Sequence, residues 1–178
     1  MDTMLIVVDA QNDFFEDGSL PVPDASEIIP VINNLQYENI IYTKDCHPPN
    51  HSSFKEFGGI WPSHCVKGSH GYLLHNDIIK KDNCHIIHKG YNKDKDSYSA
   101  FYIDGEKETP LNQLLQKLGV KNIYFCGLAY EYCVYETVMD AVKFGYNCYL
   151  IENATRGICP ETILDRRNIM VENGVVMV

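Results

Sequence analysis

The sequence is poor in basic residues and contains no long apolar run, and each shortage excludes a class of protein. Only 15 Lys and Arg stand against 24 Asp and Glu, so the formal net charge is −9 at pH 7. A nucleic-acid partner is not expected, because binding phosphates over a broad surface needs a basic face. Since the longest apolar runs have only the length of a strand, we expect no membrane-spanning segment and no membrane partner.

Several targeting and cofactor signals are also missing. The first residues, MDTMLIVVDAQND, contain no basic stretch and no cleavage site, and they are typical of a first strand. The patterns GxGxxG, GxxxxGK(S/T) and GxSxG do not occur. Their absence disfavours dinucleotide-binding, P-loop and serine-hydrolase functions, and we expect no organic cofactor.

The cysteines show no sign of a disulfide framework. Their number is odd and no CxxC pair is present, which favours reduced thiols in a cytoplasmic protein. The seven residues are Cys46, Cys65, Cys84, Cys126, Cys133, Cys148 and Cys159.

Short apolar segments alternate with helical patterns along the chain. The strand candidates are apolar on both sides, as strands buried on both faces should be. They cover residues 4–10, 39–45, 84–90, 122–128, 147–153 and 174–178. The helix candidates begin near residues 24–26 or cover 109–119, 130–144 and 160–172. This alternation predicts one α/β domain over residues 1–178, a sandwich around a mostly parallel sheet of six strands.

Residues 46–83 interrupt this alternation. The segment holds three prolines, the glycine pair Gly58–Gly59 and several histidines. An irregular excursion of this length inside a compact domain is usually functional. We therefore expect it to contribute to a binding site.

Four reactive residues fall at predicted strand ends or just beyond one. Asp9, Asp45 and Lys89 end the first three strands, and Cys133 follows the fourth, at the start of the helix over 130–144. Taken singly, each has an ordinary explanation as a turn residue, a solvated lysine or a buried thiol. Ligands of open α/β sheets bind beyond the carboxyl ends of the strands, so the four together favour a site at this edge.

The predicted position of Cys133 suits a nucleophile. A helix start favours the thiolate, and its free N–H groups can receive the oxygen of a tetrahedral intermediate. Lys89 would lower the thiol pKa further, and Asp9 could carry its proton. The three residues are a workable set for acyl transfer. A cysteine phosphatase is excluded because no arginine occurs among the seven residues after Cys133.

The segment KDCHPPNHSSF, residues 44–54, has the spacing of a metal site. Asp45 and His47 can point at one ion from an extended segment, and His51 and His64 could join them. One carboxylate with two or three imidazoles suits Zn²⁺, Fe²⁺ or Mn²⁺. A histidine-rich turn with rings facing solvent explains the spacing equally well.

These motifs resemble the nicotinamidases (pyrazinamidases) of the isochorismatase-like cysteine hydrolase superfamily. The matching segments cover most of residues 5–157 and read VVDAQNDFFEDGSL, KDCHPPNHSSF, WPSHCVKGSHG, HKGYNKDKDSYSAF and CGLAYEYCVYETVMDAVKFGY. The resemblance implies a doubly wound, three-layer α/β/α sandwich. It also implies hydrolysis of nicotinamide, and of pyrazinamide, to the acid and ammonia through a cysteine thioester. A homo-oligomer would be compatible with it.

The resemblance also implies a role for each matching residue. Asp9, Lys89 and Cys133 match a catalytic triad. One divalent ion, Zn²⁺ or else Fe²⁺ or Mn²⁺, would hold the pyridine nitrogen. The implied ligands of this ion are Asp45, His47 and His64. His51 would be a fourth ligand or a neighbour of these three. The implied contacts of the ring are Phe14, Leu20, Trp61, Tyr98, Leu128 and Ala129. The Leu128–Ala129 peptide matches a cis bond, and the Ala129 and Cys133 N–H groups match an oxyanion hole.

Two alternatives stand beside this interpretation. The first is another cysteine amidase of the same superfamily that acts on a carbamoyl or ureido compound, although metal-free members lack the histidine motifs. The second is a non-catalytic, metal-dependent binding protein. Such a protein would have no need for Asp9, Lys89 and Cys133 together.

Overall fold

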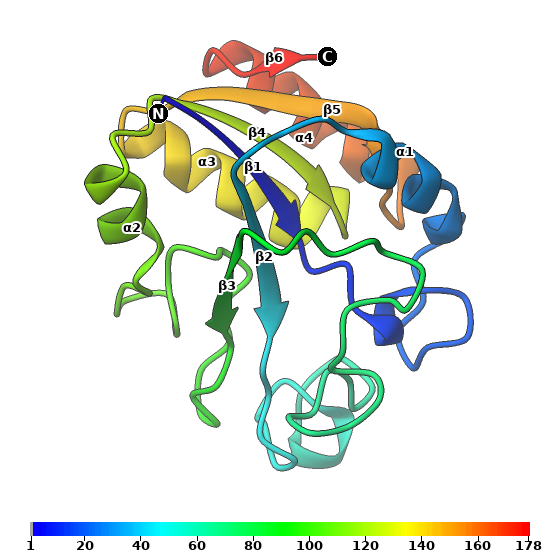
Figure 1. The fold of residues 1–178 in the computed structure, drawn as a ribbon. Coiled ribbons are helices and arrows are strands. Elements are labelled where there is room, and N and C mark those ends of the chain that lie inside the picture. The colour runs from blue at the N-terminus through cyan, green and yellow to red at the C-terminus, as the bar shows by residue number, and fades with distance from the viewer. Residues whose placement is uncertain (1) are drawn as a thin grey trace.

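Six parallel strands form a single sheet in the computed structural model, which describes residues 2–178 (Figure 1). The strands are β1 (Thr3–Val8), β2 (Ile40–Asp45), β3 (Cys84–Lys89), β4 (Asn122–Gly127), β5 (Asn147–Thr155) and β6 (Val176–Met177). Their order is β3-β2-β1-β4-β5-β6, and every pairing is parallel. The chain therefore reverses its direction of travel across the sheet between β3 and β4. This reversal opens a crevice at the carboxyl ends of β1 and β4.

Helices cover both faces of the sheet, which confirms the predicted three-layer sandwich. The helices are α1 (Ile28–Asn34), α2 (Leu111–Lys117), α3 (Tyr135–Lys143) and α4 (Pro160–Glu172). Alternate side chains of β1 point to opposite faces. Met4 and Ile6 join the core under α2, α3 and α4, whereas Leu5 and Val7 join the core under α1. No helix in the described part of the chain is long and apolar enough to cross a membrane.

The predicted elements differ from the observed ones in three places. The expectation that all strands are buried on both faces is wrong for β3, an edge strand whose His85 and Ile86 are exposed. The first helix begins at Ile28, after a 3-10 turn over Ala25–Glu27, with Pro30 at its third residue. The helix expected over 130–144 is divided into a π-helical turn, Tyr130–Val134, and α3.

The excursion over residues 46–83 lies beyond the carboxyl end of β2 (Figure 1, cyan to green). Its regular structure is limited to a short 3-10 turn, Lys55–Phe57, and isolated bridges such as His47 with Val66 and Phe54 with Trp61. The segment thus returns over the strand ends before β3 begins. This path places His47 and His64 at the crevice beyond the strand ends.

Candidate functional site

The strand ends bring Asp9, Lys89 and Cys133 together. Parallel pairing puts Asp45 at the end of β2 level with Lys89 at the end of β3, and Asp9 directly follows β1. The Lys89 Nζ lies 3.0 Å from Asp9 Oδ2, 3.4 Å from Cys133 Sγ and 2.5 Å from Asp45 Oδ1. One buried ammonium therefore contacts the thiol and two carboxylates.

Asp9 keeps one oxygen free to accept a proton. Its Oδ1 accepts a hydrogen bond from Thr43 Oγ1 at 2.6 Å, whereas Oδ2 has only the ion pair with Lys89. Side-chain atoms of Asp9, Asp45 and Cys133 lie within 4.8 Å of one another. The Asp9 carboxylate is therefore near enough to take the proton of the thiol.

The structure places Lys89 beside the Cys133 thiol, as predicted, but it buries the thiol as well. Cys133 lies in the fourth position of the π-helical turn and is 6 % exposed. Burial raises the pKa of the Cys133 thiol well above its usual value, and the nearby Lys89 offsets only part of this effect. Burial also raises the pKa of Asp9. Attack by the thiol therefore calls for a neighbouring base, and Asp9 is placed to be one.

The turn before Cys133 presents a free backbone donor. The Leu128–Ala129 peptide is cis, as the resemblance implied. Within residues 2–178 the Ala129 N–H forms no hydrogen bond, while the Ala129 carbonyl accepts from Tyr132 and Val134. The donor can therefore serve an oxygen in the pocket.

Asp45, His47 and His64 converge on one point, with candidate ligand atoms within 4.8 Å of one another. Each ring is fixed through Nδ1, by the Gly90 carbonyl at 2.7 Å for His47 and by the Pro62 carbonyl at 2.8 Å for His64. This leaves both Nε2 atoms for a ligand, an arrangement common around metal-bound histidines. The donor set suits a borderline divalent ion such as Zn²⁺.

His51 lies beside this group and has a free ring nitrogen. Its Nδ1 is 2.7 Å from Ser53 Oγ, and its buried Nε2 has no hydrogen-bond partner among the described residues. The His51 and His47 rings are 4.2 Å apart, and Asp96 forms a second convergent group with both. Asp96 was not predicted, although it lies in the matching segment HKGYNKDKDSYSAF.

Two further residues that the sequence did not single out support these ligands. The Gln11 side chain donates to the Asp45 carbonyl at 2.9 Å and accepts from the Asp45 N–H at 2.8 Å. Gly90 has φ +67°, and a Cβ there would lie 2.6 Å from His47 Cε1. The Gln11 side chain therefore holds the backbone at Asp45, and Gly90 leaves the room that the His47 ring needs.

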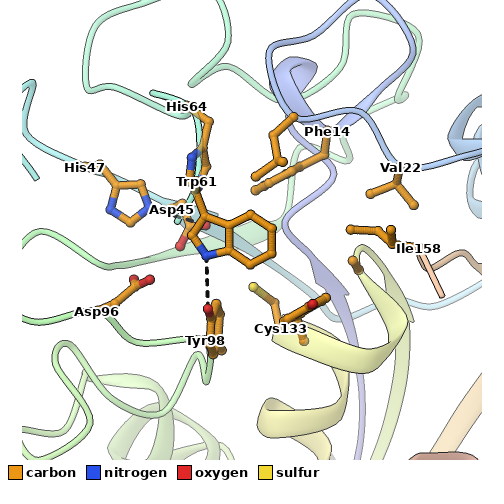
Figure 2. A pocket seen from close by; sticks show the side chains of 13 residues that line it. Phe14, Val22, Asp45, His47, Trp61, His64, Asp96, Tyr98, Cys133 and Ile158 are labelled. Atoms are coloured by element: carbon orange, nitrogen blue, oxygen red, sulfur yellow. Dashed lines mark hydrogen bonds and ion pairs between the residues drawn. The ribbon is translucent and has the colours of Figure 1, made fainter. Parts of the chain in front are cut away.

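The candidate ligands and Cys133 face the same pocket (Figure 2). The lining residues are Phe14, Leu20, Val22, Asp45, His47, Trp61, His64, Asp96, Tyr98, Ala129, Tyr132, Cys133 and Ile158. In Figure 2, the Trp61 indole lies across the pocket and donates to Tyr98 Oη at 3.0 Å.

One predicted pocket residue lies elsewhere. Leu128 is fully buried in the core under α1 and does not line the pocket. Val22, Tyr132 and Ile158 line the wall instead, and none of them had been predicted as a contact. Apolar residues in connecting segments carry no sequence signal that separates a pocket wall from a core.

Comparisons with known proteins place the chain among characterised relatives. A family model described as Isochorismatase domain matches residues 3–167. The nicotinamidase of Acinetobacter baylyi is 39% identical over 173 residues, covering 86% of this chain and 81% of its own. The crystal structure of the pyrazinamidase of Pyrococcus horikoshii in complex with zinc is 39% identical with a TM-score of 0.93, covering 100% of this chain and 99% of its own. The structure of PnC1 from L. infantum in complex with nicotinate is 37% identical with a TM-score of 0.96, covering 99% of this chain and 92% of its own.

Proposed function

The chain belongs to the isochorismatase domain family, and from this premise we propose that it is a nicotinamidase. It hydrolyses the carboxamide of nicotinamide, and also that of pyrazinamide, to the carboxylic acid and ammonia. One observation carries the proposal: a buried Asp9–Lys89–Cys133 cluster and a convergent Asp45, His47 and His64 set face one pocket. The first set supplies a nucleophile for the amide carbon, and the second supplies a position for a ring nitrogen.

Asp45, His47 and His64 would hold one divalent ion, with His51 as a further ligand or as a neighbour. When bound, this ion would supply a Lewis-acid position for the ring nitrogen of the substrate. Zn²⁺ is the proposed ion, with Fe²⁺ and Mn²⁺ as alternatives. The binding of Nδ1 of His47 and of His64 to backbone carbonyls, which leaves each Nε2 toward the site, supports this assignment.

The aromatic wall of the pocket orients the ring. Phe14, Trp61 and Tyr98 line the pocket that also contains the candidate ligands and the nucleophile. A ring fixed at its nitrogen would direct the carboxamide carbon toward Cys133. Holding reacting atoms in such an orientation lowers the barrier by removing the entropy of their encounter.

The first half of the reaction breaks the amide bond. Asp9 accepts the proton of the Cys133 thiol, and the thiolate attacks the amide carbon. The N–H groups of Ala129 and Cys133 receive the oxygen that becomes negatively charged. Asp9 then gives its proton to the departing nitrogen, ammonia leaves, and a thioester with Cys133 remains.

The second half restores the thiol. Asp9 removes a proton from water, which attacks the thioester carbon, and the carboxylic acid departs as Cys133 regains its proton. Lys89 keeps its charge throughout, because the nearby Asp45 and Asp9 carboxylates raise its pKa well above the usual value even though burial lowers it. Its fixed charge stabilises each ionised state of Asp9 and Cys133.

The seven cysteines are all free. Free thiols throughout the chain support a reducing, cytoplasmic compartment for the protein.

Ammonia release from nicotinamide by the purified protein tests the proposal. Wild-type protein should release ammonia and Cys133→Ala should not, whereas Cys148→Ala, which removes a buried thiol outside the pocket, should stay active. Release from a carbamoyl or ureido compound but not from nicotinamide would replace the proposed substrate. Equal release by wild type and Cys133→Ala would remove the proposed nucleophile.

A further inference from the structure

Ile158 closes the end of the pocket that lies away from the candidate metal ligands. In Figure 2 it lies beside Val22, while His47 and Asp45 occupy the opposite side and Cys133 lies between. Ile158 belongs to the connection between β5 and α4 and is 37 % exposed. Because the Ile158 side chain is this exposed, its own packing does little to fix its position.

Glu131 fixes this connection from the turn that carries Cys133. Its Oε1 accepts hydrogen bonds from the Ile158 and Cys159 N–H groups, both at 2.8 Å. The chain crosses over the same carboxylate at Gly157, where a Cβ would lie 2.3 Å from Glu131 Oε2. Residues 156–159 are therefore fastened to the turn two residues before the nucleophile.

Burying the carboxylate of Glu131 to make this contact costs free energy. Glu131 is 3 % exposed, and its Oε2 has no hydrogen-bond partner within residues 2–178. Two N–H groups just before α4, and the positive end of that helix, offset the burial of the charge. Because a single oxygen accepts from two consecutive N–H groups, it fixes the direction of the backbone at Ile158.

We propose that Glu131 is a positioning residue and that Ile158, held by it, determines which ring substituents the pocket accepts. This inference rests on the proposed function. With the ring nitrogen toward Asp45 and His47 and the carboxamide toward Cys133, the carbon opposite the nitrogen, C4, faces Ile158. A methyl group at C4 meets this side chain, whereas a methyl group at C6, beside the nitrogen, does not.

The test compares kcat and KM for nicotinamide, 4-methylnicotinamide and 6-methylnicotinamide. The variants are Ile158→Ala, Glu131→Gln and the double variant, each loaded with Zn²⁺. Glu172→Gln is the matched control, because it makes the same change at an exposed position at the far end of α4. The intrinsic reactivity of each amide cancels when variants are compared with wild type.

Ile158→Ala should raise kcat/KM for 4-methylnicotinamide relative to nicotinamide about ten-fold, since one methyl group in an apolar pocket discriminates by at least this factor. Glu131→Gln should shift the ratio in the same direction. The double variant should shift it no further than the larger single change, because both act through one side chain. The ratio for 6-methylnicotinamide, and both ratios in Glu172→Gln, should stay unchanged.

If folded Ile158→Ala keeps the wild-type ratio of kcat/KM for 4-methylnicotinamide to that for nicotinamide, Ile158 does not limit the pocket. If the effects of the two substitutions multiply in the double variant, Glu131 does not act through Ile158. If Glu131→Gln does not fold, Glu131→Asp replaces it; its shorter side chain retains the charge but withdraws the oxygen, so the 4-methyl ratio should rise. A wild type that releases no ammonia from nicotinamide would refute the proposed function itself. That outcome is seen before any variant is compared.

Discussion

Gly90→Ala should lower the metal affinity of the candidate site by more than its loss of fold stability explains. Gly90 has φ +67°, and an added Cβ would lie 2.6 Å from Cε1 of His47, whose Nδ1 is 2.7 Å from the Gly90 carbonyl. The left-handed backbone alone should cost alanine about 1 kcal/mol of unfolding free energy. Relief of the clash must also move the His47 ring, because real Cβ atoms do not approach this closely.

Gly145→Ala provides the matched control. Gly145 has φ +87° at the end of α3, and nothing lies within 4 Å of its added Cβ. Both variants should lose the backbone contribution in urea unfolding, and Gly90→Ala should lose more because of its clash with His47. Only Gly90→Ala should lose metal affinity, by about 10- to 100-fold, the range for disturbing a group that orients a metal-bound histidine.

The assay is competition for Zn²⁺ against a chromogenic chelator, followed by kcat/KM for nicotinamide at limiting and at saturating Zn²⁺. Gly90→Ala should fall well below Gly145→Ala at limiting Zn²⁺ and recover part of the difference at saturation. Equal affinity of the two variants for Zn²⁺ would refute the reasoning that Gly90 fixes His47 as a ligand.

Further variants test the nucleophile and the aromatic wall. Cys133→Ala should abolish turnover while Zn²⁺ affinity stays at the wild-type value, and a parallel loss of metal would show that the variant is misfolded. Tyr98→Phe removes the acceptor of the Trp61 indole N–H; KM should rise about five-fold, for the loss of about 1 kcal/mol, with kcat little changed. Trp61→Ala should weaken ring binding by about 1–3 kcal/mol, and an unchanged kcat/KM would count against its contact with the ring.

The sequence was sufficient to locate the polar half of the site. Asp9, Asp45 and Lys89 interrupt apolar segments where a parallel sheet ends, and the alternation of segments places those ends at one edge. The histidine spacing after Asp45 was compatible with a metal site but equally with a histidine-rich turn, and only the family resemblance implied Asp45, His47 and His64 as ligands. These patterns are local in the sequence, so they can be recognised without knowing how the chain packs.

What depends on packing could not be predicted. The raised pKa of Cys133 follows from its burial, which no pattern of neighbours in the sequence reports. Leu128 and Ile158 are both apolar, and only the path of the chain shows that the first faces the core and the second the pocket. The exposed side of β3 likewise follows from its place at the sheet edge.

The most direct test of the account compares ammonia release from nicotinamide and from benzamide, before and after verified metal removal. Benzamide has the same ring size and carboxamide but no ring nitrogen. We expect fast release from nicotinamide with metal and slow release from benzamide in either state. Removal of the metal should lower the nicotinamide rate to the benzamide rate. Equal rates for the two amides, or a nicotinamide rate that survives metal removal, would contradict this expectation.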